Sequence, residues 1–315
     1  MYLKPKEKLS YSLIQQWYNL ASVKFELIKF LYNREFALLI PSFINDNDVK
    51  KRSVRNLKCH SIQHLDFNLK ATDMFKKETP YCFYYSMARF KDGVPNQSLN
   101  FVKRDNTNWN ENCYKEIISY DCLIDIDAPD FDDLQFAYES AIDLKKVFNN
   151  LNVPYELRFS GMGFHFIIPY KYLPQNLTLN PHKENNLYQF LTIFVKKLYD
   201  KYSELIDMGI YDSRRVCKIP YSLALYENDA FVCTPFLNDE EFNKFRLYDY
   251  RPVNYPFDIK QRGTKIFNEN GNLSLLLLQL NLKEHIKGLS NVYNEKRVLN
   301  NNLSNENNKG GVLNG

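Results

Sequence analysis

The clearest pattern of apolar and polar positions lies in the centre of the chain. Residues 120–127 form an apolar run broken by Asp at alternate positions, which predicts a partly buried strand. Apolar residues recur at helical spacing over 131–149, and two more apolar runs, 155–159 and 164–168, flank a glycine-containing turn. The centre is therefore expected to form a strand, a helix and a hairpin, which indicates an α/β or α+β fold.

Weaker patterns on both sides of the centre predict further elements. In chain order, these are a helix over 9–31 that could be broken into two, a strand over 36–40 ended by Pro41, a strand over 81–90, a helix over 184–206, and strands over 214–219 and 231–236. Residues 45–79 are polar and basic, which favours a loop or a weak helix.

The composition indicates a folded protein with a large core. The chain has 315 residues, of which 44% are apolar and 15% aromatic, so it can bury far more apolar surface than a disordered chain. No run approaches the roughly 20 apolar residues that a membrane helix needs. The N-terminus also lacks the apolar region of a signal peptide. We therefore expect a cytoplasmic protein with no membrane partner.

Charge and cysteine content exclude little. The chain has 41 Lys and Arg against 37 Asp and Glu, and a net charge of +4 permits a polyanionic partner without indicating one. The six cysteines include no Cys-x-x-Cys pair, and an intracellular chain of this size does not need disulfides. Cys59, His60 and His64 could bind zinc with Cys82 or Cys113, but zinc ligands usually come in tighter pairs, so a zinc site is not expected.

The first candidate for chemistry is the pair Asp125 and Asp127 at the end of the central strand. Residues i and i+2 of a strand point to the same face, so both carboxylates would project together. Two such charges repel each other unless a cation lies between them, and Mg²⁺ prefers carboxylate oxygens. The alternative is a solvated strand end, since Asp-x-Asp is a common string.

The second candidate is the turn 160–165 (SGMGFH), which joins two predicted strands. Its glycines allow the backbone to approach a ligand closely, and Ser160 and His165 could contact phosphate oxygens. No Gly-Lys-Ser/Thr follows, so the turn is not a P-loop. The alternative is an ordinary glycine hairpin with an incidental histidine.

The third candidate is the segment 212–223 (DSRRVCKIPYSL). If its strand extends back to Asp212, the side chains of Asp212, Arg214 and Lys218 share a face. One carboxylate and two cations on a face would suit a complex of a metal ion with a triphosphate. The alternative is a cross-strand salt bridge on a solvent face.

In this order, the three segments resemble the three motifs of the archaeo-eukaryotic primase superfamily. The matching residues are Asp125 and Asp127 in the first motif, Ser160, Gly163 and His165 in the second, and Asp212 with 218–223 (KIPYSL) in the third. Residues 34–37 (REFA), which follow a helix with Trp17-Tyr18, and 84–90 (YYSMARF) look like flanking parts of the primase small subunit. The resemblance covers about residues 10–225.

The resemblance implies an α+β fold with a core like that of the primase small subunit. An RRM-like β-α-β-β unit and a mixed sheet would be flanked by helices. One catalytic domain would occupy residues 1–288, with the motifs within 34–224 and accessory or covering elements in 225–288. Residues 289–315 are polar and rich in Asn, which predicts a disordered tail.

The resemblance also implies metal-dependent, template-directed nucleotidyl transfer that makes or extends primers on single-stranded DNA. Asp125, Asp127 and Asp212 would be catalytic and would hold two Mg²⁺ or Mn²⁺ ions. The residues that would bind the incoming dNTP or NTP are Ser160, Gly161, Gly163, His165, Arg215, Lys218 and Arg34. For Arg34, a role in an ion pair is an equal alternative.

Two departures from the family pattern indicate which branch of the superfamily the chain resembles. Many members carry His after the Ser-Leu of the third motif, where this chain has Ala224. Replicative primases hold a zinc-binding insertion between the first two motifs, but residues 128–159 contain no Cys or His. The chain therefore looks more like the compact primase-polymerases of plasmids, phages and CRISPR-associated systems, with replication or CRISPR-associated domains or proteins as partners.

The contacts to a template strand are less predictable. A basic run over 50–58 and Trp109 with Lys103 and Arg104 are candidates, and a solvated charged loop is the alternative for each.

Two other functions are alternatives for the three motifs: a metal-dependent nuclease or phosphoesterase, and a non-catalytic nucleic-acid-binding module of a replication complex. Extension or degradation of DNA in the presence of metal distinguishes them.

Overall fold

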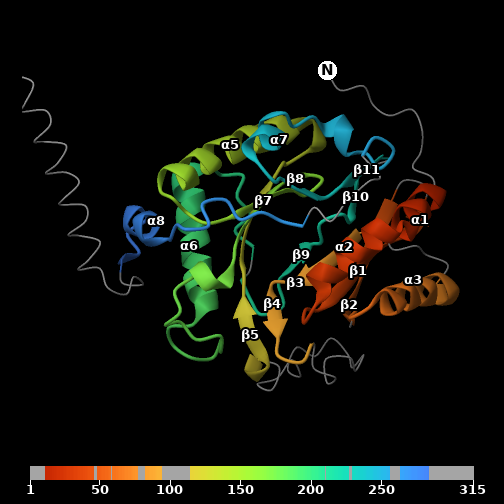
Figure 1. Ribbon diagram of the computed structural model, residues 1–315, viewed down its shortest axis with the longest axis horizontal. Helices are drawn as coiled ribbons and strands as arrows, with labels where there is room; N and C mark the ends of the chain where they lie inside the picture. The colour runs from red at the N-terminus through yellow and green to blue at the C-terminus, as the bar shows by residue number, and fades with distance from the viewer. Residues whose placement is uncertain are drawn as a thin grey trace, which may run out of the picture.

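The computed structural model has an α+β fold in which the described residues form two four-stranded and two two-stranded antiparallel sheets, flanked by helices (Figure 1). It describes residues 11–45, 48–57, 59–76, 82–93, 114–209, 211–226, 229–255 and 263–283. In Figure 1, the helices α1, α2 and α3 group on one side of the molecule, and α5 and α6 group on the other. No helix among the described residues is long and apolar enough to cross a membrane.

The central sheet contains the elements that the sequence pattern predicts best. Its strands are β6 (Cys122–Asp127), β7 (Glu156–Phe159), β8 (Gly163–Ile168) and β12 (Thr234–Pro235), in the order β12-β7-β8-β6. The helix α5 (Leu134–Asn150) connects β6 to β7. The predicted strand, helix and hairpin are thereby confirmed. The expected mixed sheet is not found among the described strands, because β8 lies between the parallel strands β6 and β7 and every neighbouring pair is antiparallel.

The two faces of the central sheet have different chemistry. Phe164 and Phe166 of β8 lie on the face that α5 covers, where Phe148 of α5 packs edge-on against Phe166 with ring centroids 5.5 Å apart. His165, between them in the strand, points to the opposite face. Burial of one apolar face therefore fixes the register of β8 and, with it, the direction of the polar side chains.

The second sheet is built mainly from the first part of the chain. Its strands are β1 (Phe36–Asn45), β2 (Asp48–Leu57), β3 (Cys82–Ser86) and β9 (Val216–Lys218), in the order β2-β1-β3-β9. The late strand β9 joins this sheet by pairing with β3. The segment that carries the third candidate motif is thus held by the sheet opposite the one that carries the first two.

The helices beside this sheet agree with the prediction of a broken helix. They are α1 (Tyr11–Asn19) and α2 (Ala21–Leu31), separated by the extended residue Leu20 with ψ of 125°. The predicted strand is longer than expected, because β1 continues through Pro41. Pairing between β1 and β3 ends at Leu39, so the proline lies where no hydrogen bond to β3 is needed.

The prediction for residues 45–79 is wrong in its first half. The strand β2 pairs with β1 over most of its length, and α3 (Ile62–Lys76) follows it. A two-stranded extension of a sheet can be polar on both faces, so its sequence lacks the alternation that indicates a strand. The predicted tail over 289–315 lies outside the described residues.

The remaining strands are short. β4 (Ala88–Phe90) pairs with β5 (Ile117–Tyr120), and β10 (Leu223–Tyr226) pairs with β11 (Asp229–Val232). The helix predicted over 184–206 is α6 (Leu187–Tyr202). Its cap is Asn186, whose side chain accepts a hydrogen bond from Gln189 N.

Residues 229–283 pack onto the central sheet where they are described. β12 extends the sheet by pairing with β7, and the short helix α7 (Asp239–Asn243) places the buried Phe242 5.8 Å from the ring of Phe164. The last described helix is α8 (Ser274–Gln279). These contacts agree with a covering role for this part of the chain.

The turn between β7 and β8 cannot accept a side chain at Gly163. A Cβ added there would lie 1.9 Å from the carbonyl oxygen of Ile126 in the neighbouring strand. We expect Gly163→Ala to lower the free energy of unfolding by about 3 kcal/mol or more, because strand backbone would have to move. Chemical denaturation measures this loss. The control is Gly263→Ala, where nothing lies within 4 Å of the added Cβ and the φ of +62° alone should cost about 1 kcal/mol. Equal losses for the two variants would contradict the prediction.

Candidate active site

Three charged side chains form a row across the central sheet, on the face away from α5. Asp125 of β6 pairs with His165 of β8, and His165 pairs in turn with Arg158 of β7. Asp127, two residues further along β6, pairs with Gly163 of β8. Because directly paired residues project to the same side, the first two candidate motifs share one face.

Asp125 and His165 form the centre of this row. His165 is buried, and its Nε2 lies 3.2 Å from Oδ1 of Asp125. Burial disfavours the charged carboxylate, but His165 beside it and the charges of Lys218 and Arg215 outweigh this and hold the pKa of Asp125 below its usual value. The carboxylate is therefore ionised at neutral pH.

Asp127 is the more exposed of the two acids, and its pKa is shifted in the opposite direction. Partial desolvation and the negative charge of Asp125 raise its pKa. Asp125 and Asp127 lie on one strand face and their pKa values shift in opposite directions. A cation between them would stabilise both negative charges. Mg²⁺ and Mn²⁺ favour such oxygen donors, so the residues fit the expected metal.

Residues of the opposite sheet approach this row from β9. Cys217 Sγ lies 3.2 Å from Nδ1 of His165, and both side chains are buried. Lys218 follows in the strand, and its positive charge acts on both Asp125 and Asp127. The structure thus places the second motif beside the acidic pair and the basic residue of the third motif on the facing sheet.

The glycine turn presents a hydroxyl that has no protein partner. Ser160 is fully buried, and its Oγ makes no hydrogen bond in the described part of the chain. Its backbone N donates to the carbonyl oxygen of Gly163 at 2.9 Å, which closes the turn. Buried polar atoms without a partner are rare, so this hydroxyl is a candidate for ligand contact.

Gly161 is required by the same turn. Its φ is +98°, a conformation that favours glycine, and a Cβ at this position would lie 2.2 Å from Cβ of Ala224. Ala224 is itself buried. The position where many primases carry His is therefore occupied by a small side chain that packs against the turn.

Asp212 does not join the acidic pair. The strand β9 begins only at Val216, and the carboxylate of Asp212 accepts a hydrogen bond from Arg214 N at 2.8 Å. This local turn replaces the predicted strand extension, so Asp212, Arg214 and Lys218 do not share a strand face. Among the described residues, no three side chains of His, Cys, Asp and Glu form a group that could hold a metal ion.

Asp207 lies nearer to the pair and was missed by the sequence analysis. Its backbone N donates to the carbonyl oxygen of Asp125 at 2.7 Å, and its negative charge acts on Asp127. Its carboxylate forms an ion pair with Arg215 at 3.1 Å. The signal available was a second Asp shortly before the basic stretch, but no sequence pattern distinguishes it from Asp212.

Arg215 lies near Asp125 and Asp207, whereas Arg34 contacts Asp121. Besides its ion pair with Asp207, Arg215 stacks on Tyr211 with its guanidinium carbon 4.6 Å from the ring centroid. Its charge also lowers the pKa of Asp125. Arg215 can therefore reach a phosphate beside the acidic pair.

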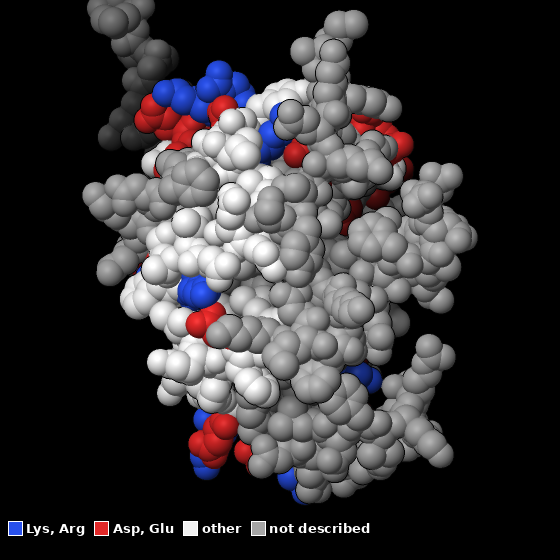
Figure 2. Space-filling view, turned by 90° about the vertical axis from the view of Figure 1, so that its right-hand side faces the viewer, with Lys and Arg blue, Asp and Glu red and all other residues white. Residues whose placement is uncertain are grey.

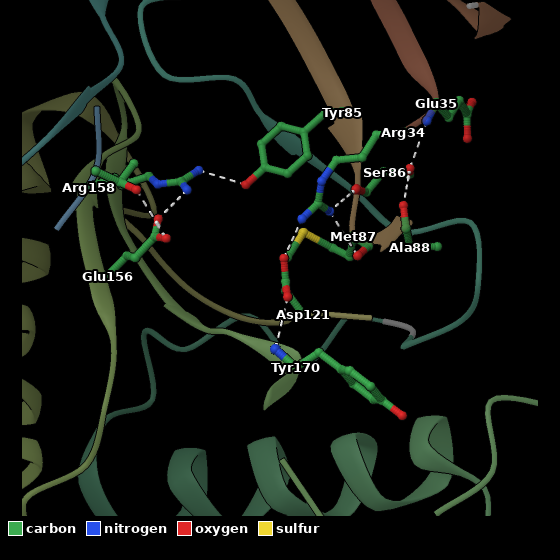
Figure 3. A network of polar contacts seen from close by, with 11 residues as sticks. Arg34, Glu35, Tyr85, Ser86, Met87, Ala88, Asp121, Glu156, Arg158 and Tyr170 are labelled. Carbon is green, nitrogen blue, oxygen red and sulfur yellow. Dashed lines mark hydrogen bonds and ion pairs between the residues drawn. The ribbon is translucent and has the colours of Figure 1, made fainter. Parts of the chain in front are cut away.

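Arg34 is buried in a polar network at the junction of the sheets (Figure 3). Its guanidinium donates to the carbonyl oxygens of Ser86 and Met87, at 2.6 and 2.9 Å, and forms an ion pair with Asp121. Asp121 also accepts a hydrogen bond from Tyr170 N. In the structure, Arg34 makes the ion pair given as the alternative, and Nη1 and Nη2 together contact three protein acceptors.

A second contact in Figure 3 spans the two sheets. Arg158 of β7 and Tyr85 of β3 point toward each other, and the guanidinium donates to the Tyr85 hydroxyl at 2.7 Å. Arg158 also forms an ion pair with Glu156. The pairs Arg158–Tyr85 and His165–Cys217 therefore hold the two sheets at a defined distance from each other.

The segment after Lys218 is held by α1. Tyr221 has φ of +70°, and its carbonyl oxygen accepts a hydrogen bond from Trp17 Nε1 at 2.8 Å. Leu223 N donates to the Tyr18 hydroxyl at 2.9 Å. The Trp17-Tyr18 pair thus fixes the backbone that follows the basic residue of the third motif.

The template candidates are not tested by the structure. Lys58, Lys103, Arg104 and Trp109 lie outside the described residues, and so does Cys113 from the zinc hypothesis. Figure 2 shows one face of the molecule, on which the described Lys and Arg lie beside Asp and Glu. This part of the surface does not identify a nucleic-acid partner.

Comparison with known proteins gives distant likenesses to solved structures alone. No family model and no curated protein matches the chain. Among solved structures, the polymerase domain of Mycobacterium tuberculosis Ligase D in complex with DNA is similar, with a TM-score of 0.43 and 10% sequence identity. The match covers 83% of this chain and 96% of that one. A likeness of this size identifies neither a family nor an activity.

Proposed function

We propose that the chain is a DNA primase-polymerase that transfers nucleotides to a primer, or starts one, on single-stranded DNA. The observation that carries the proposal is the meeting of three motifs at one junction. Asp125 and Asp127 lie on β6, His165 lies beside them on β8, and the charge of Lys218 on the other sheet acts on both acids. The order and spacing of these motifs resemble the primase superfamily, and their assembly in space agrees with that resemblance.

Asp125 and Asp127 are the residues that would hold Mg²⁺ or Mn²⁺. Their shared strand face and opposed pKa shifts fit a cation bound between them. The bound ion would supply a Lewis acid for the primer 3′-hydroxyl and for the charge on the departing pyrophosphate. Asp207 acts on this pair through its charge, and its carboxylate would join the ion in place of Asp212 only if its ion pair with Arg215 opens.

The residues around the glycine turn would bind the triphosphate. Ser160 offers a hydroxyl with no hydrogen-bond partner among the described residues, and His165 and Lys218 offer cationic groups at the same junction. Arg215 can add a bidentate contact if its ion pair with Asp207 opens. These fixed groups would hold the nucleotide in line with a 3′-hydroxyl and exclude water from the reacting phosphate.

The partners that follow are a single-stranded DNA template, a primer, and dNTPs or NTPs. Members of plasmid, phage or CRISPR-associated systems are the nearest type of primase-polymerase by motif pattern. The residues that contact the template are left open, because the candidate basic segments lie largely outside the described side chains.

A synthesis assay tests the proposal. The protein is given a single-stranded DNA template with labelled dNTPs or NTPs, with and without a primer, in Mg²⁺, Mn²⁺ or EDTA. We expect template-directed products with metal and none with EDTA. Shortening of the template would instead indicate a nuclease, and template binding without products from folded protein would indicate a non-catalytic module.

A further inference from the structure

The imidazole of His165 is held from both sides by residues of different sheets. On its own sheet, Nε2 faces Asp125 at 3.2 Å, and from β9 the Cys217 thiol lies 3.2 Å from Nδ1. His165 is 3% exposed and Cys217 is 2% exposed. Both side chains are therefore shielded from bulk water in this structure.

The two contacts determine the hydrogen-bonding role of each ring nitrogen of His165. A carboxylate only accepts hydrogen bonds, so the nitrogen that faces Asp125 carries a hydrogen. The thiol can donate to Nδ1 or accept from it, so Cys217 satisfies Nδ1 in either state of the ring. A ring fixed at Nδ1 keeps Nε2 directed at the place where Asp125 and the proposed phosphate meet.

The other described cysteines do not have this role. Cys233 contacts the carbonyl oxygen of Ser160, and Cys82 contacts the hydroxyl of Ser222. Cys122 is buried at the start of β6, where it pairs with Ile168 of β8. Cys217 is distinguished by its imidazole partner and by its place on the strand that also carries Lys218.

We propose that Cys217 is a positioning residue, which holds the His165 ring by its Nδ1 so that the Nε2 hydrogen stays directed at the place where Asp125 and the triphosphate of the nucleotide meet. This inference rests on the proposed nucleotide site. It also explains how the two sheets form one site, because the thiol of one sheet orients the imidazole of the other. The third motif thus contributes the charge of Lys218 and the orientation of His165.

The test compares Cys217→Ala, Cys217→Ser and Cys122→Ala in the full chain. Serine keeps a group that donates and accepts, alanine removes it, and Cys122→Ala removes a buried thiol that has no imidazole partner. Binding of a fluorescent nucleotide and the KM and kcat of synthesis are measured for each. Nitrogen NMR of ¹⁵N-histidine-labelled protein reports the state of the His165 ring, which a His165→Asn variant assigns among the five histidines.

We expect Cys217→Ala to weaken nucleotide binding and raise KM about tenfold, as the loss of one buried hydrogen bond to a charged group implies. In Cys217→Ala, the ¹⁵N signals of His165 should shift or broaden because the ring is no longer held by a partner at Nδ1. Cys217→Ser should stay within about threefold of wild type, and Cys122→Ala should change neither the signals nor KM.

Two results would overturn the inference. One is a Cys217→Ala protein with unchanged His165 signals or unchanged nucleotide affinity, and the other is a serine variant that behaves like the alanine variant. These outcomes are separate from the fate of the proposed function. A wild-type protein that binds nucleotide through His165 but makes no product would remove the polymerase assignment and leave the role of Cys217 in place.

Discussion

Replacement of Asp125 or Asp127 by asparagine is expected to reduce template-directed synthesis by at least a factor of about 1,000. Asparagine keeps the shape of aspartate but removes the negative charge that a divalent cation needs. Loss of bound metal removes several kcal/mol of transition-state stabilisation, and each 1.4 kcal/mol is a factor of ten in rate. Single-turnover primer extension in saturating Mg²⁺ or Mn²⁺ measures the effect.

The control for this experiment is Asp132→Asn. Asp132 is exposed just beyond the end of β6, so its replacement removes one charge close in sequence without touching the strand face. We expect its rate to remain within about twofold of wild type, and circular dichroism should show all three variants folded. An Asp127→Asn enzyme with a near wild-type rate would remove the acidic pair from the mechanism.

The central sheet was predictable because its pattern is local. In β6 and β8, each side chain faces either the buried side under α5 or the junction with the other sheet, and the alternation is visible in the sequence. β2 was not predictable in this way, because a polar strand is defined by its pairing with β1 and not by burial. Long-range pairing leaves no local pattern in the sequence.

The acidic pair and the glycine turn were predictable for a related reason. Asp125 and Asp127 are two residues apart in a strand, and Ser160 and His165 flank a short turn, so their geometry follows from local structure. The contact between Cys217 and His165 joins residues 52 positions apart, on different sheets. Only the assembled fold shows that this thiol, which the sequence analysis treated as a small buried hydrophobe, faces an imidazole.

The role of Arg34 shows a limit of motif resemblance. The sequence places Arg34 next to a segment that looks like the primase small subunit, which admits both a nucleotide contact and an ion pair. In the fold, Asp121 and two carbonyl oxygens occupy the guanidinium. A buried arginine that has satisfied its donors in this way holds the junction of the sheets together and is costly to remove.

The choice between Asp207 and Asp212 leads to the second large expected effect. We expect Asp207→Asn to slow synthesis by a factor of about 100 or more, and Asp212→Asn to slow it less than fivefold. The Asp207 carboxylate acts electrostatically on Asp127, while the Asp212 carboxylate accepts a hydrogen bond from the backbone of its own turn. Removal of a third carboxylate would weaken a metal site that two carboxylates still partly form.

The measurement is primer extension across a range of Mn²⁺ concentrations for both variants. A metal role for Asp207 predicts that its loss raises the Mn²⁺ concentration needed for half-maximal rate, which a purely structural role would leave unchanged. Asp249→Asn provides the matched control, because it breaks an exposed Asp–Arg ion pair of similar length, 3.0 Å to Arg246, that belongs to no proposed site. If Asp212→Asn shows the larger loss and the larger Mn²⁺ requirement, the turn at Asp212 must open when metal and nucleotide bind, and the assignment from the sequence would be the correct one.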